Sequence, residues 1–575
     1  MNMCYSRWIY NVARFDSKAN AEDTAERLDI FKPPDQTMSV TIILFYVFIT
    51  AFMLLSYNPK PRKILESIKS FLLHLVHLSK NVVSTTIHVP PDAMQMNQAE
   101  PVYTVWDIPG PKRLPLVGTR WMYYVGRYKL NKMQDAFVDL HKRYGNIVLE
   151  FDHVPIVNLF DRVDMEKVLK YPSKYPYRPP TEIVEYYRRS RPDRFASTGI
   201  VNTQGEQWHE LRVKLTSGIM SRKLLQAFIP TLNEIADEFV TLIRQKRDSN
   251  DCVKDFQDIA NTVGLEIICC FVLGRRMGYM SGDKQKNEKF VKLAEAVKST
   301  FMYISQSYYG VKLWKYLPTK LYRDYVRCEE IIYDTIAEIV NEALAEEQEK
   351  CAADDMRGIF LNILQSEGLD KKDKIAGIID LIHAAIETFS NTLSFLLNNM
   401  TSHPERQARI ASEFTSDTIT NNDLVNAAFT RACIKESYRI SPTTPCLARI
   451  LEEDFDLSGY QLKAGTVVLC HTRVACQNEQ NFQQANTFLP ERWLEQVDEN
   501  QNVYKLDEPG SSLVLPFGTG RRMCPGNKII EIELTLIMAK IFQQFKVEYH
   551  SQLDTQFQFL LAPGTPIEII FRDRD

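Results

Sequence analysis

The sequence predicts a mainly α-helical protein with a minor β-sheet portion. Apolar residues recur with helical periodicity in six stretches, which are residues 128–143, 222–247, 253–274, 324–350, 374–400 and 423–440. Strand signals are fewer, namely two short apolar runs around Asp152-His153 within residues 146–160 and a hairpin pattern within residues 455–469 around Gly459 and Ala464-Gly465. No internal repeat is visible.

Composition narrows the classes of function. The chain has 575 residues, of which 45% are hydrophobic, enough for a large core. A formal net charge of -3 argues against a general nucleic-acid binder, so we expect no nucleic-acid partner. The 11 cysteines are scattered and include no C-x-x-C pair, which favours free thiols in a reducing compartment over a disulfide framework.

The front of the chain differs from the rest. Residues 1–37 carry mixed charge and form an N-terminal extension with two interpretations, an atypical leader or a segment ahead of a true start at Met38. Residues 38–58 hold an uncharged apolar run and are a candidate membrane anchor. Residues 59–105 begin with a basic amphipathic segment, either membrane-surface or solvated, and continue as a linker. We expect the catalytic domain to span residues 106–575.

One cysteine stands in a distinctive loop. Cys524 lies within the run Phe517-Gly518-Thr519-Gly520-Arg521-Arg522-Met523-Cys524-Pro525-Gly526, directly before a long helical stretch. Glycines let backbone N–H groups approach the sulfur, and the positive N-terminal end of a helix favours a thiolate. Arg522 adds a nearby cation. The ordered F-x-x-G-x-R-x-C-x-G spacing is not explained by a buried structural cysteine.

This loop resembles the haem-binding loop of the cytochrome P450 superfamily. The resemblance implies the cytochrome P450 fold, with haem b held between a distal helix (the I helix) and the cysteine loop, and with Cys524 as the axial ligand of the haem iron. It also implies cofactor-binding roles for other residues, including Trp208 and Arg212 of a W-x-x-x-R motif that would reach a haem propionate. The remaining ones are Arg449, Phe517, Arg522 and Gly526.

Two further motifs follow in the order of that family. Glu436 and Arg439 form E-x-x-R, which places both on one helix face. The resemblance implies that they join Arg492 of Pro490-Glu491-Arg492-Trp493 in a buried structural network behind the cysteine loop.

The distal motif is Ala384-Ala385-Ile386-Glu387-Thr388. By resemblance, Glu387 and Thr388 are the catalytic residues. Thr388 would hydrogen-bond the dioxygen bound at the haem, and Glu387 would help relay protons for cleavage of the O–O bond. Ala385 departs from the family pattern, which usually has glycine there, and its methyl group is expected either to narrow the pocket or to restrict the bound substrate.

Longer stretches resemble insect ecdysteroid hydroxylases of the mitochondrial P450 clan. They include residues 106–112, 168–176, 178–183, 190–194, 313–316 and 446–453. The resemblance implies hydroxylation of a steroid, ecdysone at carbon 20, to give 20-hydroxyecdysone. Two alternatives are another steroid or xenobiotic hydroxylase of that clan and a haem protein that binds sterol without turnover.

The resemblance also implies a source of electrons, which is NADPH acting through a redox partner. An adrenodoxin-type ferredoxin would dock on Arg431, Lys435 and Lys528, in a mitochondrial enzyme on the matrix side of the inner membrane. The apolar run within residues 38–58 favours the alternative, an endoplasmic-reticulum membrane enzyme served by NADPH-cytochrome P450 reductase. For both alternatives, the mitochondrial and the endoplasmic-reticulum enzyme, we expect membrane association, a steroid substrate and dioxygen.

Overall fold

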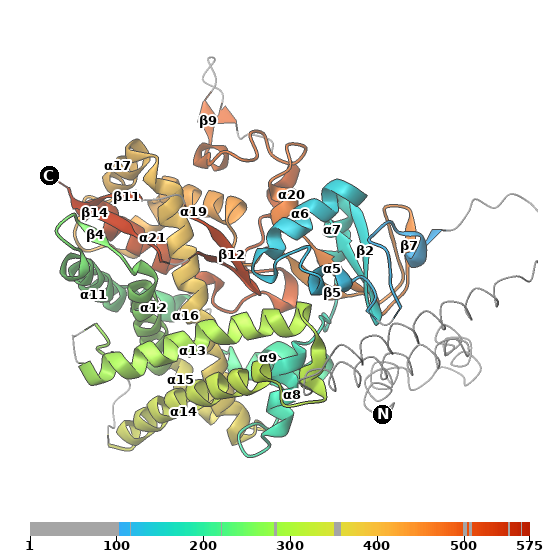
Figure 1. Ribbon diagram of the computed structural model, residues 1–575. Coiled ribbons are helices and arrows are strands. Elements are labelled where there is room, and N and C mark those ends of the chain that lie inside the picture. The colour runs from blue at the N-terminus through green and yellow to red at the C-terminus, as the bar shows by residue number, and fades with distance from the viewer. Residues whose placement is uncertain are drawn as a thin grey trace, which may run out of the picture. The chain divides into compact units, whose positions relative to one another are not determined.

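The computed structural model describes residues 103–574, except residues 116, 220, 281–283, 350–357, 498–502, 505–508, 550–552 and 565 (Figure 1). The predicted N-terminal extension and the membrane-anchor candidate lie outside the described residues, as does nearly all of residues 59–105. The described part is mainly helical with small sheets, as the sequence predicts.

The helix α16 (Lys371–Thr401) is 31 residues long and runs through the helical part of the molecule (Figure 1). Its first turn is capped by Asp370, whose side chain accepts from the N–H of Lys372. Four long helices contact it, which are α12 (Phe256–Leu273), α13 (Lys284–Tyr309), α14 (Lys320–Glu349) and α19 (Ala428–Ile440).

Five of the six predicted helical stretches correspond to a single helix each. They match α6 (Met133–Tyr144), α11 (Arg222–Lys246), α12, α14 and α16. The sixth, residues 423–440, is divided at Ala427, which has φ -70° and ψ 65° and separates α18 (Asn421–Asn426) from α19. The long helix α13 was not among the predicted ones.

Further helices complete the helical part. They are α5 (Trp121–Tyr124), α7 (Arg162–Leu169), α8 (Glu182–Ser190), α9 (Gly199–Asn202), α10 (Gly205–Leu215), α15 (Gly358–Gln365), α17 (Pro404–Ser412), α20 (Thr472–Cys476) and α21 (Asn527–Gln544). Short 3₁₀ helices include η6 (Pro490–Trp493) and η8 (Gly520–Arg522).

The largest sheet has four strands in the order β2-β3-β8-β5. The strands β2 (Ile147–Asp152) and β3 (Val154–Leu159) form an antiparallel hairpin that turns at His153, which has a φ of 62°. The strand β8 (Val467–Cys470) runs parallel to β3, and β5 (Leu447–Ile450) pairs antiparallel with β8.

The remaining strands form small sheets. One contains β1 (Tyr103–Thr104), β7 (Tyr460–Leu462) and β6 (Phe455–Leu457), and a second contains β11 (Phe545–Tyr549), β14 (Ile569–Asp573) and β4 (Cys252–Val253). Two-stranded pairs join β12 (Thr555–Gln558) to β13 (Leu560–Pro563) and β9 (Gln496–Val497) to β10 (Val503–Tyr504).

The predicted hairpin over residues 455–469 is correct only in its first half. The strands β6 and β7 pair around Ser458 and Gly459, which both have positive φ values, 51° and 80°, as a two-residue hairpin turn requires. The chain then leaves this sheet at Gly465, with a φ of 87°, and β8 joins the four-stranded sheet instead.

The main core is built by helices. Its buried apolar side chains come chiefly from α11, α12, α13, α14, α16, α19 and α21, and a smaller cluster packs on the four-stranded sheet. Among the described residues, α12 is long and apolar enough to cross a membrane, but 83% of its most apolar window is buried inside the protein. We therefore assign α12 to the core.

Candidate active site

Cys524 sits at the junction of η8 and α21. Its backbone N–H donates to the carbonyl of Phe517 at 2.8 Å, which closes the loop. Gly518 and Gly520 have φ values of 73° and 69°, in the left-handed region that favours glycine. Of the three glycines in the motif, Gly518 and Gly520 are therefore required by the path of the backbone.

Cys524 is an exposed residue, yet its thiol is partly desolvated by the surrounding protein. Desolvation raises its pKa, while the N–H of Gly526 and the charges of Arg212 and Arg178 lower it. A Cβ atom added at Gly526 would lie 3.7 Å from the sulfur, which is ordinary contact. Gly526 thus acts on the sulfur through its N–H group, and its small size is not essential there.

Arg522 does not act as the expected cation beside the thiol. Its guanidinium donates to the carbonyls of Pro176 at 2.6 Å and Thr203 at 2.8 Å, and it lies over the ring of Trp208 with 4.1 Å to the ring centroid. The charges that stabilise the thiolate come from Arg212 and Arg178 instead. The reason is that the donors of Arg522 are used to tie residues 176–208 to the cysteine loop.

Two other predicted arginines also hold the loop. Arg212 donates to the carbonyl of Met523 at 2.6 Å, and Arg449 donates to the carbonyl of Thr519 at 3.3 Å. Trp208 is buried, and the guanidinium of Arg522 packs over its ring. Trp208 and Arg212, which share a face of α10, thus contact the cysteine loop from the same side.

Arg178 joins this group, although the sequence reasoning did not assign it to the cofactor. Desolvation, Arg449 and Arg212 lower its pKa to about 10, and desolvation and three arginines lower the pKa of Arg522 to about 8. The only feature of the sequence that points to Arg178 is its position at the start of residues 178–183, a run that resembles the family. It lies far from the cysteine motif along the chain, so no local pattern connects the two.

The four arginines share one electrostatic property. None of them forms an ion pair with a carboxylate of the described residues, and desolvation lowers the pKa of each one. Buried guanidinium groups favour bidentate carboxylate partners. The set is therefore suited to a ligand with two carboxylates beside a thiolate, which is the chemistry of haem.

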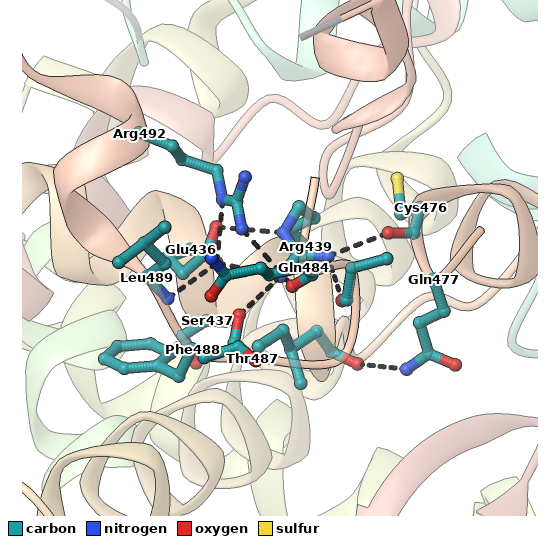
Figure 2. Close-up of polar contacts among 12 residues, drawn as sticks. Glu436, Ser437, Arg439, Cys476, Gln477, Gln484, Thr487, Phe488, Leu489 and Arg492 are labelled. Carbon is teal, nitrogen blue, oxygen red and sulfur yellow. Dashed lines mark hydrogen bonds and ion pairs between the residues drawn. The ribbon is translucent and has the colours of Figure 1, made fainter. Parts of the chain in front are cut away.

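Behind the loop lies a buried ion-pair network (Figure 2). Both oxygens of Glu436 accept from Arg439, at 2.8 and 2.9 Å, and Glu436 also accepts from Arg492 at 3.1 Å. The side chains of all three are fully buried.

Backbone groups complete this network. Arg439 donates further to the carbonyls of Cys476, Ala485 and Thr487, and the N–H of Leu489 donates to Glu436. The charge of Glu436 is thus shared by two arginines, whose remaining donors fix residues 476–489.

The distal motif lies in the middle of α16. Ala384 is exposed and Thr388 is half-buried, whereas Ile386 and Glu387 are buried. The Ala384–Thr388 face therefore borders accessible space in the middle of α16, between the buried stretches 376–380 and 389–397. The hydroxyl of Thr388 donates to the carbonyl of Ala384 at 2.7 Å, and Ala385 is half-buried beside it.

The side chains of Glu387 and Thr388 form hydrogen bonds with different partners. Its Oε1 accepts from Nε2 of Gln257 on α12 at 3.2 Å, while its buried Oε2 has no hydrogen-bond partner among the described residues. Burial raises the pKa of Glu387 to about 7. A carboxyl group of this kind exchanges protons at neutral pH.

The three predicted docking residues are exposed. Arg431 and Lys435 lie on α19, and Lys528 lies in the first turn of α21, which packs against α19. Nζ of Lys435 is 3.9 Å from the ring centroid of Trp493. Nζ of Lys528 is 4.0 Å from Glu531.

Comparison with known proteins defines the class. The cytochrome P450 family model matches residues 108–571, and the chain belongs to that family. The protein is therefore a haem-dependent monooxygenase in which electrons derived from NAD(P)H are used.

Three relatives illustrate the range of the family. The chain is 50% identical over 483 residues to ecdysone 20-monooxygenase from Drosophila melanogaster, covering 82% of this chain and 89% of the relative. It is 28% identical over 480 residues to the mitochondrial 1,25-dihydroxyvitamin D(3) 24-hydroxylase from Mus musculus, covering 82% and 90%. The probable cytochrome P450 12a5, mitochondrial, from Drosophila melanogaster is 29% identical over 474 residues, covering 78% and 87%.

Proposed function

We propose that this protein hydroxylates ecdysone at carbon 20 and releases 20-hydroxyecdysone. The observation that supports the assignment of the substrate is the 50% identity to ecdysone 20-monooxygenase across most of both chains. The single observation that supports the chemistry is the position of the Cys524 loop among four arginines, none of which forms an ion pair with a carboxylate of the described residues.

Specific residues take specific roles in this proposal. Cys524 ligates the haem iron, and Arg178, Arg212 and Arg449 bind the propionates. Trp208 and Arg522 support them by fixing the segment that carries Arg178, and Phe517 and Gly526 shape the loop. When bound, haem b supplies dioxygen activation and oxidation of an unactivated C–H bond.

Protons are supplied by the protein. Glu387 holds and releases a proton near neutral pH, because burial raises its pKa to about 7. The hydroxyl of Thr388 lies on the accessible face of α16 and passes that proton to the oxygen side of the site. Ala385 limits the space beside it and orients the steroid.

A turnover assay tests the substrate. Purified protein with a ferredoxin, its reductase, NADPH, dioxygen and ecdysone should form 20-hydroxyecdysone, identified by retention time and mass. Cholesterol-type and vitamin D-type steroids serve as competitors. Hydroxylation of another steroid, with ecdysone left unchanged, would defeat the substrate assignment and leave the monooxygenase class intact.

The mitochondrial relatives support a ferredoxin-type partner, and we propose an adrenodoxin-type ferredoxin acting in the mitochondrial matrix. Exposure of Arg431, Lys435 and Lys528 supports docking of an acidic surface. Arg431→Glu should raise the ferredoxin concentration needed for half-maximal turnover, and the effect should grow at low salt. Lys463→Glu, an exposed charge reversal between β7 and β8, is the matched control. Equal effects of both variants would remove the docking assignment, and turnover with NADPH-cytochrome P450 reductase alone would favour the alternative partner.

Membrane association has support from one exposed segment. Between α13 and α14, the side chains of Val311, Leu313, Tyr316 and Leu317 are 44–75% exposed. Adjacent exposed apolar side chains are typical of an interaction surface. We propose that this segment contacts the inner membrane, and Leu313→Ser combined with Tyr316→Ser should reduce co-flotation of the full chain with lipid vesicles. Because residues 38–58 are a second candidate for membrane binding, flotation that stays unchanged when the double substitution is made in a chain lacking residues 38–58 would exclude this segment as a membrane contact.

A further inference from the structure

Glu387 is connected to the protein surface by polar side chains from two other helices. Gln257 of α12 donates through Nε2 to Glu387 Oε1 at 3.2 Å and to Asn391 Oδ1 at 2.9 Å. Nζ of Lys298, on α13, donates to Gln257 Oε1 at 3.0 Å. Gln257 is buried and Lys298 is half-buried, so the chain runs from the interior outward.

The orientation of the Gln257 amide is fixed by chemistry. A lysine ammonium only donates hydrogen bonds, so the amide oxygen of Gln257 must face Lys298. Its NH₂ group must then face Glu387 and Asn391. The carboxyl of Glu387 is therefore held toward α12 in one orientation, with Oε2 left without a hydrogen-bond partner among the described residues.

Charges of opposite sign act on this carboxyl. Lys298 lowers the pKa of Glu387 and Asp258 of α12 raises it, while the neighbouring Asn391 amide also lowers it. Asp258 is exposed and is itself influenced by Asp255, Lys298 and Glu295. Gln257 and Asp258 are thus adjacent residues of α12, one buried and one exposed.

We infer that Gln257, Lys298 and Asp258 are positioning residues for Glu387, and that protons reach Glu387 from solvent through the α12–α13 surface. The inference rests on the proposed role of Glu387 as proton donor. A proton from bulk water enters where Asp258 and Lys298 meet solvent and neutralises the Glu387 carboxylate. The carboxyl then releases that proton toward Thr388 and is ready for the next one.

The signs of the expected effects are fixed by electrostatics. A nearby cation favours the ionised carboxylate, so removing Lys298 must make Glu387 harder to deprotonate. Removing the anion at Asp258 must have the opposite effect. Because the proton donor is the neutral form, activity falls as pH rises through the pKa of Glu387, and this alkaline limb must move in the same directions.

The test uses the full-length holoenzyme and two readouts. The first is the infrared carbonyl band of the protonated carboxyl, assigned as the band absent from Glu387→Gln, and followed against pH. The second is the alkaline limb of 20-hydroxyecdysone formation. Lys298→Met should shift both midpoints to higher pH and Asp258→Asn to lower pH. Lys298→Arg should keep the wild-type midpoints, and Lys292→Met, an exposed lysine of the same helix, is the matched control.

The outcomes separate two failures. An alkaline limb retained in Glu387→Gln would remove Glu387 as the proton donor and with it the proposed role. A different result would overturn only the present inference. In that case the alkaline limb is lost in Glu387→Gln, but Lys298→Met and Asp258→Asn either leave its midpoint unchanged or shift it in the same direction. Gln257→Met should lower the amount of product formed per NADPH at neutral pH. Its ferrous–carbonyl spectrum should remain that of the wild type, because the cysteine loop is untouched.

Discussion

The guanidinium of Arg522 lies on the indole ring of Trp208, 4.1 Å from its centroid, and the two residues are 314 positions apart in the sequence. The same guanidinium donates to the carbonyls of Pro176 and Thr203. This contact joins α10 to the cysteine loop and fixes the segment that carries Arg178.

Replacing Trp208 by leucine is expected to destabilise the protein by about 3 kcal/mol. The change leaves a cavity in a buried site and removes a desolvated cation–π contact. Chemical denaturation measures the loss, and the haem-to-protein ratio should fall as well. Trp106→Leu is the matched control, since that ring also carries an arginine, Arg113 at 5.2 Å, but is 49% exposed. Similar losses from both variants would contradict the account of Trp208.

Replacing Glu436 by glutamine is expected to lower the free energy of unfolding by about 3 kcal/mol or more. Arg439 and Arg492 then lose their ion pairs with the Glu436 carboxylate, and breaking a buried ion pair by neutralising one partner is strongly unfavourable. Denaturant unfolding checks the prediction. Glu548→Gln removes a half-exposed partner of Arg572 at 3.3 Å and should have a far smaller effect. Equal stability of the two variants would show that the buried network does not stabilise the protein more than an exposed ion pair does.

Thr388→Val is expected to uncouple electron use from product formation. Valine keeps the shape of threonine but cannot pass a proton, so NADPH and dioxygen are consumed while the product yield falls on the order of tenfold. The measurement is product formed per NADPH oxidised. Thr392→Val, one turn further along α16, loses its bonds to Thr388 and Thr443 and should change stability but not coupling. Normal coupling in Thr388→Val would show that its hydroxyl is not needed.

Stability is expected to fall as pH decreases from about 6.5. Burial lowers the pKa of His471 to about 3 and that of His383 to about 4, so both are neutral in the folded protein and bind protons more readily when unfolded. Their contribution is therefore present above the unfolded pKa and is lost as pH falls through this window. Between pH 7.5 and 5.5, each histidine should lower the free energy of unfolding by about 1 kcal/mol.

The histidine contribution is separable by mutation. His471 donates to Asn158 Oδ1, because the NH₂ group of Asn158 donates to Glu150, and glutamine preserves that donor without titrating. His471→Gln should reduce the loss of thermal stability between pH 7.5 and 5.5, whereas His153→Gln, at an exposed turn, should not. An unchanged loss in His471→Gln would contradict the assignment.

The sequence predicts best what depends on short spacing. Glu436 and Arg439 lie three residues apart on one helix, and the glycines around Cys524 act within one loop, so their patterns are visible in the chain itself. Family order then connected Arg492, Arg212 and Arg449 to them. The division of residues 423–440 depends on one backbone angle at Ala427, which apolar periodicity does not report.

Contacts between distant segments were not predictable in this way. Arg178 meets Arg449 through folding alone, and Gln257 meets Glu387 across 130 positions. Arg522 was expected to stabilise the thiolate, since proximity in sequence suggests proximity of charge, but carbonyl groups of residues 176–203 bind it instead. The strand β8 likewise left its predicted hairpin because β3, far earlier in the chain, offered a parallel partner.

The measurement that tests the central claim most directly is the absorption spectrum of the reduced protein exposed to carbon monoxide. Thiolate ligation by Cys524 predicts the red-shifted Soret band of haem-thiolate proteins in the wild type and its loss in Cys524→Ser. Gly526→Ala, which adds only an ordinary contact at 3.7 Å, should retain the band. A wild-type Soret band typical of histidine-ligated haem, or an unchanged thiolate band in Cys524→Ser, would contradict the account.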